Sequence, residues 1–323
     1  MMAEIVIAVG SSHGPSIQSP PEFWARLGEG DTRDPRFDYA ALLAAAKPGL
    51  EAEITLDVQR KRHAAAQAAL AKLQTTIASA NPDVVIVISN AHRIRPHDAH
   101  PVFGIMRAGV FPVMKRAEQP FDPDSRFIPE DKRRPEKIAQ ERPGHAALAD
   151  HLIGGLIGEG FDVACVDSLP DGVALDDAFC FPDEWLFVGR KIPIVPLMVS
   201  RDLPNQATAG RCYDLGLALR RQIALWPTKL RVGLIASGGL SHQIVDEELD
   251  REVIAALSGA NAATLRGLSR ERLNRAPGTP EILNWVVAAA AMAPIKMTLV
   301  DYLPCYRSMA GTGHGLTFGY WAP

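Results

Sequence analysis

The chain has 323 residues, 47% of them hydrophobic, and its 34 Lys and Arg residues nearly balance its 37 Asp and Glu residues. A chain of this length can bury a sizeable core. Its net charge of −3 is too small to favour binding to nucleic acid or to a membrane surface. We therefore expect a small, roughly neutral partner.

The cysteines and the apolar runs predict the compartment. The four cysteines are scattered and form no CxxC pair, which in a chain this long predicts free, buried thiols rather than a disulfide framework. The first residues contain no basic region followed by an apolar core of signal-peptide length. The apolar run Val286–Pro294 is too short to span a bilayer. These features predict a cytoplasmic protein without a membrane span.

Four short apolar runs, rich in Val and Ile, alternate with helical segments. The runs are continuous, which is typical of strands whose two sheet faces are both covered by helices. They are Ile5–Val9, Val84–Ile88, Ile194–Val199 and Val232–Ile235. The helical segments are Ala64–Ala80, Ala146–Ile157, Tyr213–Leu225 and Glu281–Ala291. We expect an α/β fold, a three-layer sandwich with helices on both faces of a central, mostly parallel or mixed sheet.

Two stretches, residues 16–38 and 116–144, interrupt this alternation. Both contain Pro and mixed charges without clear periodicity. A solvated surface excursion is the simplest interpretation, although long loops in a compact domain are often lids or binding loops. Because strand signals resume after each stretch, residues 1–323 are predicted to form a single domain with two insertions.

Three of the predicted strands are each followed by a histidine. His13, His92 and His242 follow the first, second and fourth apolar runs. Ligands of open α/β sheets bind beyond the carboxyl ends of the strands, so three histidines at equivalent ends predict a shared site. A single histidine at such a position is more often a capping or hydrogen-bonding residue. His314, in a glycine-rich run, could also approach a ligand.

Four motifs in this chain resemble those of the class III extradiol dioxygenases. They are SSHGPS around His13, SNAH ending at His92, SGGLSHQ around His242 and GTPEILNW around Glu281. The chain is similar to the catalytic β subunit of protocatechuate 4,5-dioxygenase and its relatives, and the run SSHGPSIQSPPEFWARL looks most like the 3-O-methylgallate dioxygenases. The similarity covers nearly the whole chain apart from the segment after His13 and the charged loop. Four motifs in the right order make it specific.

The resemblance implies that His13, His92 and Glu281 bind Fe(II) and that His242 is the acid–base residue. Two imidazoles and a carboxylate occupy one face of the ion and leave positions open for a catechol and O₂. A histidine with an ordinary pKa of about 6.5 can take up and return a proton near neutrality. Glu281 also has a simpler interpretation, because a glutamate at the start of a helix is favoured by the helix dipole.

The resemblance also implies substrate-binding positions. Asn90 matches a family position near the substrate, although an ordinary turn residue is the simpler interpretation. Asp171 stands where the family has a histidine close to the substrate, which puts the substrate pocket in doubt. Thr312, or the nearby Tyr306 and Arg307, would replace a serine that helps to hold the substrate carboxylate.

We therefore expect a ring-cleavage dioxygenase that uses Fe(II) and incorporates both atoms of O₂ into a catecholic acid. Substrates of the protocatechuate, gallate or 3-O-methylgallate type fit this resemblance, as in the catabolism of lignin-derived aromatic compounds. The resemblance also implies a homodimer. The segment 16–38 is hypothesised to replace the separate capping subunit of the protocatechuate enzyme, as a cap or as a dimer contact.

Two other functions remain open. A Zn²⁺-dependent hydrolase is possible because two histidines and a glutamate also bind zinc with an open water site. The absence of an HExxH motif and the origin of the histidines in separate strands argue against it. A non-catalytic binding module of the same fold is the other alternative, which the replacement at Asp171 keeps open.

Overall fold

The four Val- and Ile-rich runs form neighbouring strands at the centre of one sheet. The computed structural model describes residues 2–90, 101–114, 138–169 and 174–323. The central strands lie in the order β1-β8-β2-β7 and are parallel to one another. Their bounds are β1 Glu4–Ser11, β8 Arg231–Ser237, β2 Val84–Ser89 and β7 Ile194–Val199. All residues of β2 and β7 are buried, as expected for strands covered on both faces.

Shorter or antiparallel strands extend this centre on both sides. In the part of the chain that the structure describes, the sheet has nine strands in the order β10-β11-β1-β8-β2-β7-β3-β6, with β9 pairing with β11. The added strands are β3 Phe103–Met106, β6 Val163–Val166, β9 His242–Ile244, β10 Thr298–Tyr306 and β11 Thr312–Trp321. A separate antiparallel ribbon consists of β4 Val110–Met114 and β5 Ile138–Pro143. The sheet is therefore mixed, with a parallel centre.

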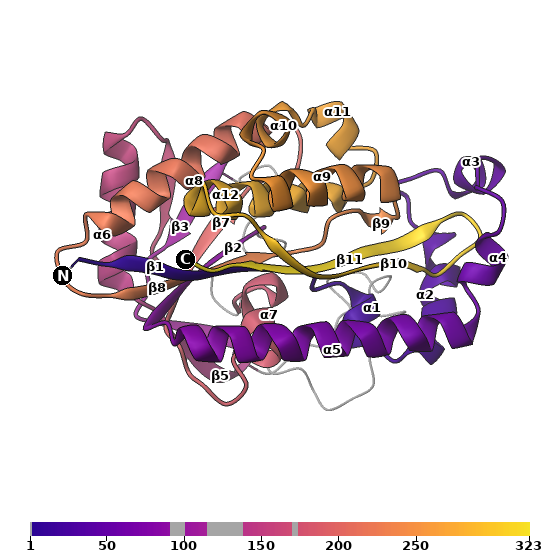
Figure 1. The fold of residues 1–323 in the computed structure, drawn as a ribbon, viewed down its shortest axis with the longest axis horizontal. Helices are drawn as coiled ribbons and strands as arrows, with labels where there is room; N and C mark the ends of the chain where they lie inside the picture. Colours follow the sequence, from indigo (N-terminus) through magenta and orange to yellow (C-terminus); the bar gives the residue numbers. More distant parts are fainter. Residues whose placement is uncertain (1, 91–100, 115–137, 170–173) are drawn as a thin grey trace.

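Helices cover both faces of the sheet, so the predicted three-layer α/β sandwich is confirmed (Figure 1). One face carries α6 Ala146–Gly158, α8 Ala209–Ala224, α9 Glu247–Gly259, α10 Ala262–Gly267, α11 Arg270–Leu273 and α12 Ile282–Met292. Every residue of α12 is buried. Gly216 of α8 lets α8 and α12 approach closely, since a Cβ at Gly216 would lie 2.7 Å from the Cβ of Ala290 in α12.

The other face is covered by the long helix α5 and by α7, together with short N-terminal helices (Figure 1). These elements are α1 Pro15–Gln18, η1 Pro21–Phe23, α2 Trp24–Asp31, α4 Leu50–Glu53, α5 Leu56–Ala80 and α7 Asp177–Trp185. The short helix α3 Tyr39–Ala44 has no buried residue and lies on the same side of the sheet as α9 (Figure 1). Helix α5 begins at Leu56, earlier than the predicted Ala64. Its first turns carry exposed charged residues, including Arg60 and Lys61, and so lack the apolar pattern on which the prediction rested. No helix among the described residues is both long enough and apolar enough to cross a membrane.

The segment 16–38 differs from the predicted solvated excursion. It forms short helices, and Ile17, Trp24 and Leu27 are fully buried against the core on the α5 side. Its last helix ends at Asp31, whose carboxylate accepts two hydrogen bonds from Arg307, at 2.6 and 2.8 Å, in a buried ion pair. This segment is therefore part of the packed structure. The other predicted insertion, 116–144, lies largely outside the described residues.

The cysteines are free thiols, as predicted. Cys180, Cys212 and Cys305 are buried, whereas Cys165 on β6 is exposed. The expectation of burial is therefore wrong for Cys165, because β6 is an edge strand of the sheet.

Candidate metal centre and active site

The ends of β1 and β8 bring three of the predicted site residues together. Ser11 and Ser237 are register partners where these parallel strands end, so the segments that follow leave the same edge of the sheet. His13 follows β1, and His242 begins β9 a few residues after β8. Glu281 ends the 3₁₀ turn η5 Thr279–Glu281, which leads into α12.

Glu281 is the point on which the two histidines converge. Its Oε2 lies 3.7 Å from Nε2 of His13 and 3.9 Å from Nδ1 of His242. The carboxylate is fully buried and accepts hydrogen bonds from the backbone N–H of Gly239 at 3.2 Å and from Nη1 of Arg201 at 2.8 Å. Its orientation is therefore fixed from two sides.

The two glycines of the SGG motif make room for this carboxylate. Gly238 has a φ of +135°, and a Cβ there would lie 2.6 Å from Oε2 of Glu281. The backbone of Gly238 and Gly239 thus lies directly against Glu281. A side chain at position 238 would be both strained and in collision with the carboxylate.

Arg201 is a residue of this site that the sequence analysis missed. It follows β7 at the same edge of the sheet, in the sequence Ser200-Arg201-Asp202. The rule that identified the histidines, polar residues directly after a buried strand, applies to Arg201 as well. Charged side chains on loops are common, however, so the position alone did not distinguish it.

His242 is held in a cluster of close contacts. Its ring meets the ring of His314 edge-to-face, with centroids 4.5 Å apart, because the two residues are register partners on β9 and β11. Nδ1 of His314 is hydrogen-bonded to Oγ of Ser16 at 2.8 Å. A Cβ on Gly14 would lie 2.8 Å from the His314 ring and 3.4 Å from that of His242. The segment after His13 thus contacts His314 through Ser16, and Gly14 leaves room for both imidazoles.

Burial lowers the pKa of His242 to about 4, although the charge of Glu281 opposes this shift. The imidazole is therefore neutral at pH 7 in this arrangement. The neutral ring can still accept a proton, but at this lowered pKa it is a weaker base than a histidine with the ordinary pKa of about 6.5 expected from the sequence.

Two predicted residues, His92 and Asp171, lie outside the described residues. Asn90, which follows β2, is described and buried at the same edge of the sheet. Its Oδ1 accepts a hydrogen bond from Asn284 of α12 at 3.1 Å, and its Nδ2 donates to the carbonyl of Val199. Asn90 therefore ties β2 to β7 and α12 beside the site.

The predicted carboxylate-binding residues fall in different surroundings. Thr312 is buried, shares a hydrogen bond of 2.6 Å with the hydroxyl of Ser308, and lies on the same side of β11 as His314. The hydroxyl of Tyr306 instead donates to Glu247 at 2.7 Å, beneath the Lys47 ammonium. The structure thus places Thr312 on the His314 side of β11 and engages Tyr306 in an ion-pair cluster.

The donor atoms of His13 and Glu281 fit a divalent metal ion. An imidazole nitrogen and a carboxylate oxygen 3.7 Å apart are beyond hydrogen-bonding distance. Two ligands that each lie about 2.1 Å from one ion are separated by roughly 3 to 4 Å. Among the described residues, no group of three or more His, Cys, Asp or Glu is arranged to hold a metal. The third predicted ligand, His92, is outside that part of the chain.

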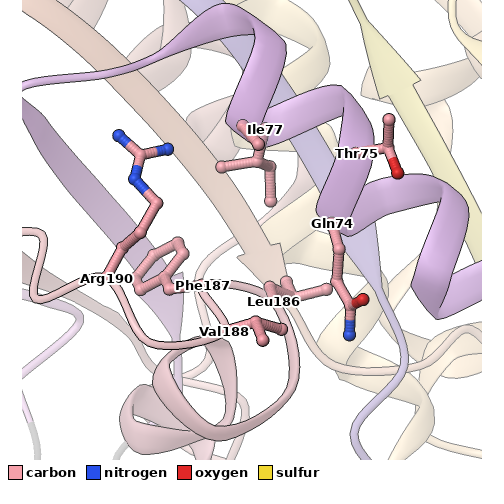
Figure 2. Close-up of a pocket in the computed structure, with 8 residues that line it drawn as sticks. Gln74, Thr75, Ile77, Leu186, Phe187, Val188 and Arg190 are labelled. Atoms are coloured by element: carbon pink, nitrogen blue, oxygen red, sulfur yellow. The ribbon is translucent and has the colours of Figure 1, made fainter.

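A pocket lies elsewhere in the molecule and contains none of the proposed site residues. Figure 2 shows it between the last turns of α5 and the segment after α7, where it is lined by Gln74, Ile77, Phe187 and Arg190 among others, with a volume of about 210 Å³. Nη2 of Arg190 donates to Oδ1 of Asn81, just before β2 begins. The pocket is thus near the amino end of β2, opposite the edge that carries the histidines.

Comparisons with known proteins agree with the predicted resemblance. Residues 53–316 match the model of a family described as the catalytic LigB subunit of aromatic ring-opening dioxygenase. The chain is 39% identical over 107 residues to a gallate dioxygenase of Pseudomonas putida, a match that covers 32% of this chain and 30% of that protein. An uncharacterized protein from Escherichia coli K12, JW3007, aligns over 98% of this chain and 99% of its own, at 13% identity and a TM-score of 0.44, a remote likeness. Since the family match spans most of the sequence, this chain belongs to the LigB family of catalytic subunits of aromatic ring-opening dioxygenases.

Proposed function

We propose that this protein is an extradiol dioxygenase that uses Fe(II) and O₂ to open the ring of a catecholic acid of the protocatechuate, gallate or 3-O-methylgallate type. One observation carries the proposal: His13 and His242 converge on the buried Glu281 at the carboxyl edge of the parallel strands. Membership of the aromatic ring-opening dioxygenase family and the partial similarity to a gallate dioxygenase support the substrate class.

In this proposal His13, Glu281 and His92 hold the iron. The bound ion would supply a Lewis-acid centre that favours loss of a catechol proton and brings the ring next to O₂. Arg201 and the N–H of Gly239 hold the Glu281 carboxylate in place through its two oxygens. Two imidazoles and one carboxylate leave open positions for a bidentate ligand.

His242 is the proposed acid–base residue. Its neutral imidazole can accept the proton that a catechol hydroxyl releases on binding and can return that proton when the ring opens. His314 and Gly278 lie close against the ring and restrict its movement. A fixed donor–acceptor geometry is what general acid–base catalysis needs.

Of the three residues considered for the substrate carboxylate, Thr312, Tyr306 and Arg307, we propose Thr312, because Arg307 is paired with Asp31. Thr312 lies on the same side of β11 as His314, which is the register partner of His242. The Tyr306 hydroxyl, by contrast, donates its hydrogen bond to Glu247. We further propose that the segment 16–38 forms a wall of the site. Ser16 contacts His314, and the buried pair of Asp31 and Arg307 fastens the end of α2 to the sheet. The family resemblance also favours a homodimer.

Reconstitution with iron tests this function. The protein is loaded with Fe(II) without oxygen, mixed with protocatechuate, gallate or 3-O-methylgallate, and then exposed to O₂ while oxygen uptake and the yellow ring-opened product are followed. We expect uptake with at least one acid, and loss of iron in His13→Ala. The matched control is His151→Ala, which we expect to keep its iron. His151 lies on α6, where its ring is hydrogen-bonded to the carbonyl of Gln222 at 2.8 Å and contacts the ring of Trp226.

Other outcomes would contradict the proposal in distinct ways. Retained zinc without oxygen uptake would favour the hydrolase. No bound metal at all would favour a binding module.

A further inference from the structure

Ser237, at the end of β8, links His13 to helix α7 through hydrogen bonds. Ser237 is fully buried, and its Oγ lies 2.9 Å from Nδ1 of His13. The same hydroxyl donates a hydrogen bond of 2.6 Å to the backbone carbonyl of Ala178 in the first turn of α7. His13, Ser237 and Ala178 thus form one chain of hydrogen bonds.

The direction of these hydrogen bonds determines which ring nitrogen of His13 carries a proton. A serine hydroxyl has one proton, and a carbonyl oxygen can only accept. Because the Ser237 proton points to Ala178, the Ser237 oxygen must accept the hydrogen bond from His13. Nδ1 of His13 therefore carries a proton, and in the neutral ring the lone pair lies on Nε2, the nitrogen that faces Glu281 at 3.7 Å. A metal ion needs that lone pair.

The sequence of α7 explains why the Ala178 carbonyl is available. In a regular helix this carbonyl would accept from the N–H of the residue four positions later. That residue is Pro182, which lies inside α7 and has no N–H. The same helix places the ring of Phe181 against His13, with centroids 6.0 Å apart. Helix α7 therefore contacts His13 directly through Phe181 and indirectly through Ser237.

We propose that Ser237 is a positioning residue that holds His13 in the Nδ1–H tautomer, and that Pro182 keeps the Ala178 carbonyl available to orient the Ser237 hydroxyl. The link to metal binding rests on the proposed function. The tautomer of His13 does not, because it follows from hydrogen bonds within the protein. Ligand histidines commonly depend on such a partner, whose loss costs about 10- to 100-fold in metal affinity.

The tautomer is tested directly in the metal-free protein. Long-range proton–nitrogen NMR spectra of the imidazoles distinguish a protonated from an unprotonated ring nitrogen, and the His13 signals are identified by their absence in His13→Gln. We expect Nδ1 protonated and Nε2 unprotonated in the wild type, and a mixture of tautomers in Ser237→Ala. A wild-type His13 that carries its proton on Nε2 overturns the proposal.

Metal affinity provides the second readout. Anaerobic competition of Fe(II) against a chromogenic chelator gives the dissociation constant of each variant. We expect Ser237→Ala to weaken binding about 10- to 100-fold and Ser237→Thr, which keeps the hydroxyl, to restore most of it. Ser89→Ala is the matched control, since the buried Ser89 hydroxyl at the same sheet edge donates to the Ser237 carbonyl at 3.2 Å and not to His13.

A further variant separates the helix from the serine. Pro182→Ala supplies an N–H that competes for the Ala178 carbonyl, so we expect weaker metal binding with Ser237 intact. Unchanged affinity in both Ser237→Ala and Pro182→Ala overturns the proposal. If the wild type binds no divalent metal, the proposed function fails, and the NMR measurement still decides the tautomer.

Discussion

A single methyl group at Gly278 is expected to displace the proposed acid–base residue. Gly278 precedes the turn that carries Glu281 and packs against His242, so that an added Cβ would lie 2.5 Å from both Cβ and Cγ of that histidine. The backbone there has φ −94° and ψ −18°, which alanine adopts readily. The effect of Gly278→Ala is therefore steric and not a matter of backbone strain.

The size of the effect follows from this overlap. Ordinary van der Waals contact begins near 3.4 Å, so the imidazole of His242 must move by roughly 1 Å. A displacement of about 1 Å in a reacting group can lower a rate by about 10²-fold. Because His242 is not a proposed iron ligand, we expect kcat to fall about 100-fold while the iron content stays near that of the wild type.

The assay is oxygen uptake by Fe(II)-loaded enzyme at saturating substrate, with iron measured on the same samples. Gly267→Ala is the control, because a Cβ at Gly267 meets no atom within 4 Å. A Gly278→Ala enzyme with wild-type kcat would refute the role of His242. A fall in kcat that merely matches a loss of iron would refute the separation of roles between His242 and Glu281.

Three further changes have effects that the structure makes specific. Gly238→Ala should lower iron affinity, measured by chelator competition, because its Cβ would lie 2.6 Å from the Glu281 carboxylate; unchanged affinity would contradict the position of that ligand. Asp31→Asn should lower the free energy of unfolding by about 3 to 5 kcal/mol in urea titration, since it leaves the buried Arg307 without a counter-charge. Burial raises the pKa of Asp250 from 3.8 to about 7, so the wild type should lose stability relative to Asp250→Asn as the pH rises from about 4 to about 7; parallel stability curves for the two proteins would contradict this.

Much of the fold was predictable because its centre consists of local signals. The apolar runs that form β1, β2, β7 and β8 have no alternation, and burial on both faces imposes that pattern directly on the sequence. The C-terminal hairpin of β10 and β11 was not predicted. Glycines interrupt the strand signal of β11, and one of them, Gly315, is needed because the buried Asp250 occupies the space beside it.

Some residues of the candidate site were predictable from local sequence, and the contacts that hold them were not. The histidines were predicted because each follows a buried strand, whereas Glu281 was predicted only from the family resemblance of the motif around it. The contacts that hold them join residues far apart in the chain, such as Ser16 with His314 and Asp31 with Arg307. A hydroxyl or a guanidinium at one position in the sequence does not indicate its distant partner. The packing of residues 16–38 against the rest of the protein could therefore be seen only in the structure.

Anomalous diffraction measures most directly whether His13, His92 and Glu281 hold one iron ion. Crystals of the Fe(II)-loaded protein, grown without oxygen, are measured on both sides of the iron absorption edge. We predict one anomalous peak between Nε2 of His13 and the carboxylate of Glu281, with His92 as the third protein ligand. A peak bound elsewhere, or one that contacts fewer than these three side chains, would contradict the proposed metal centre.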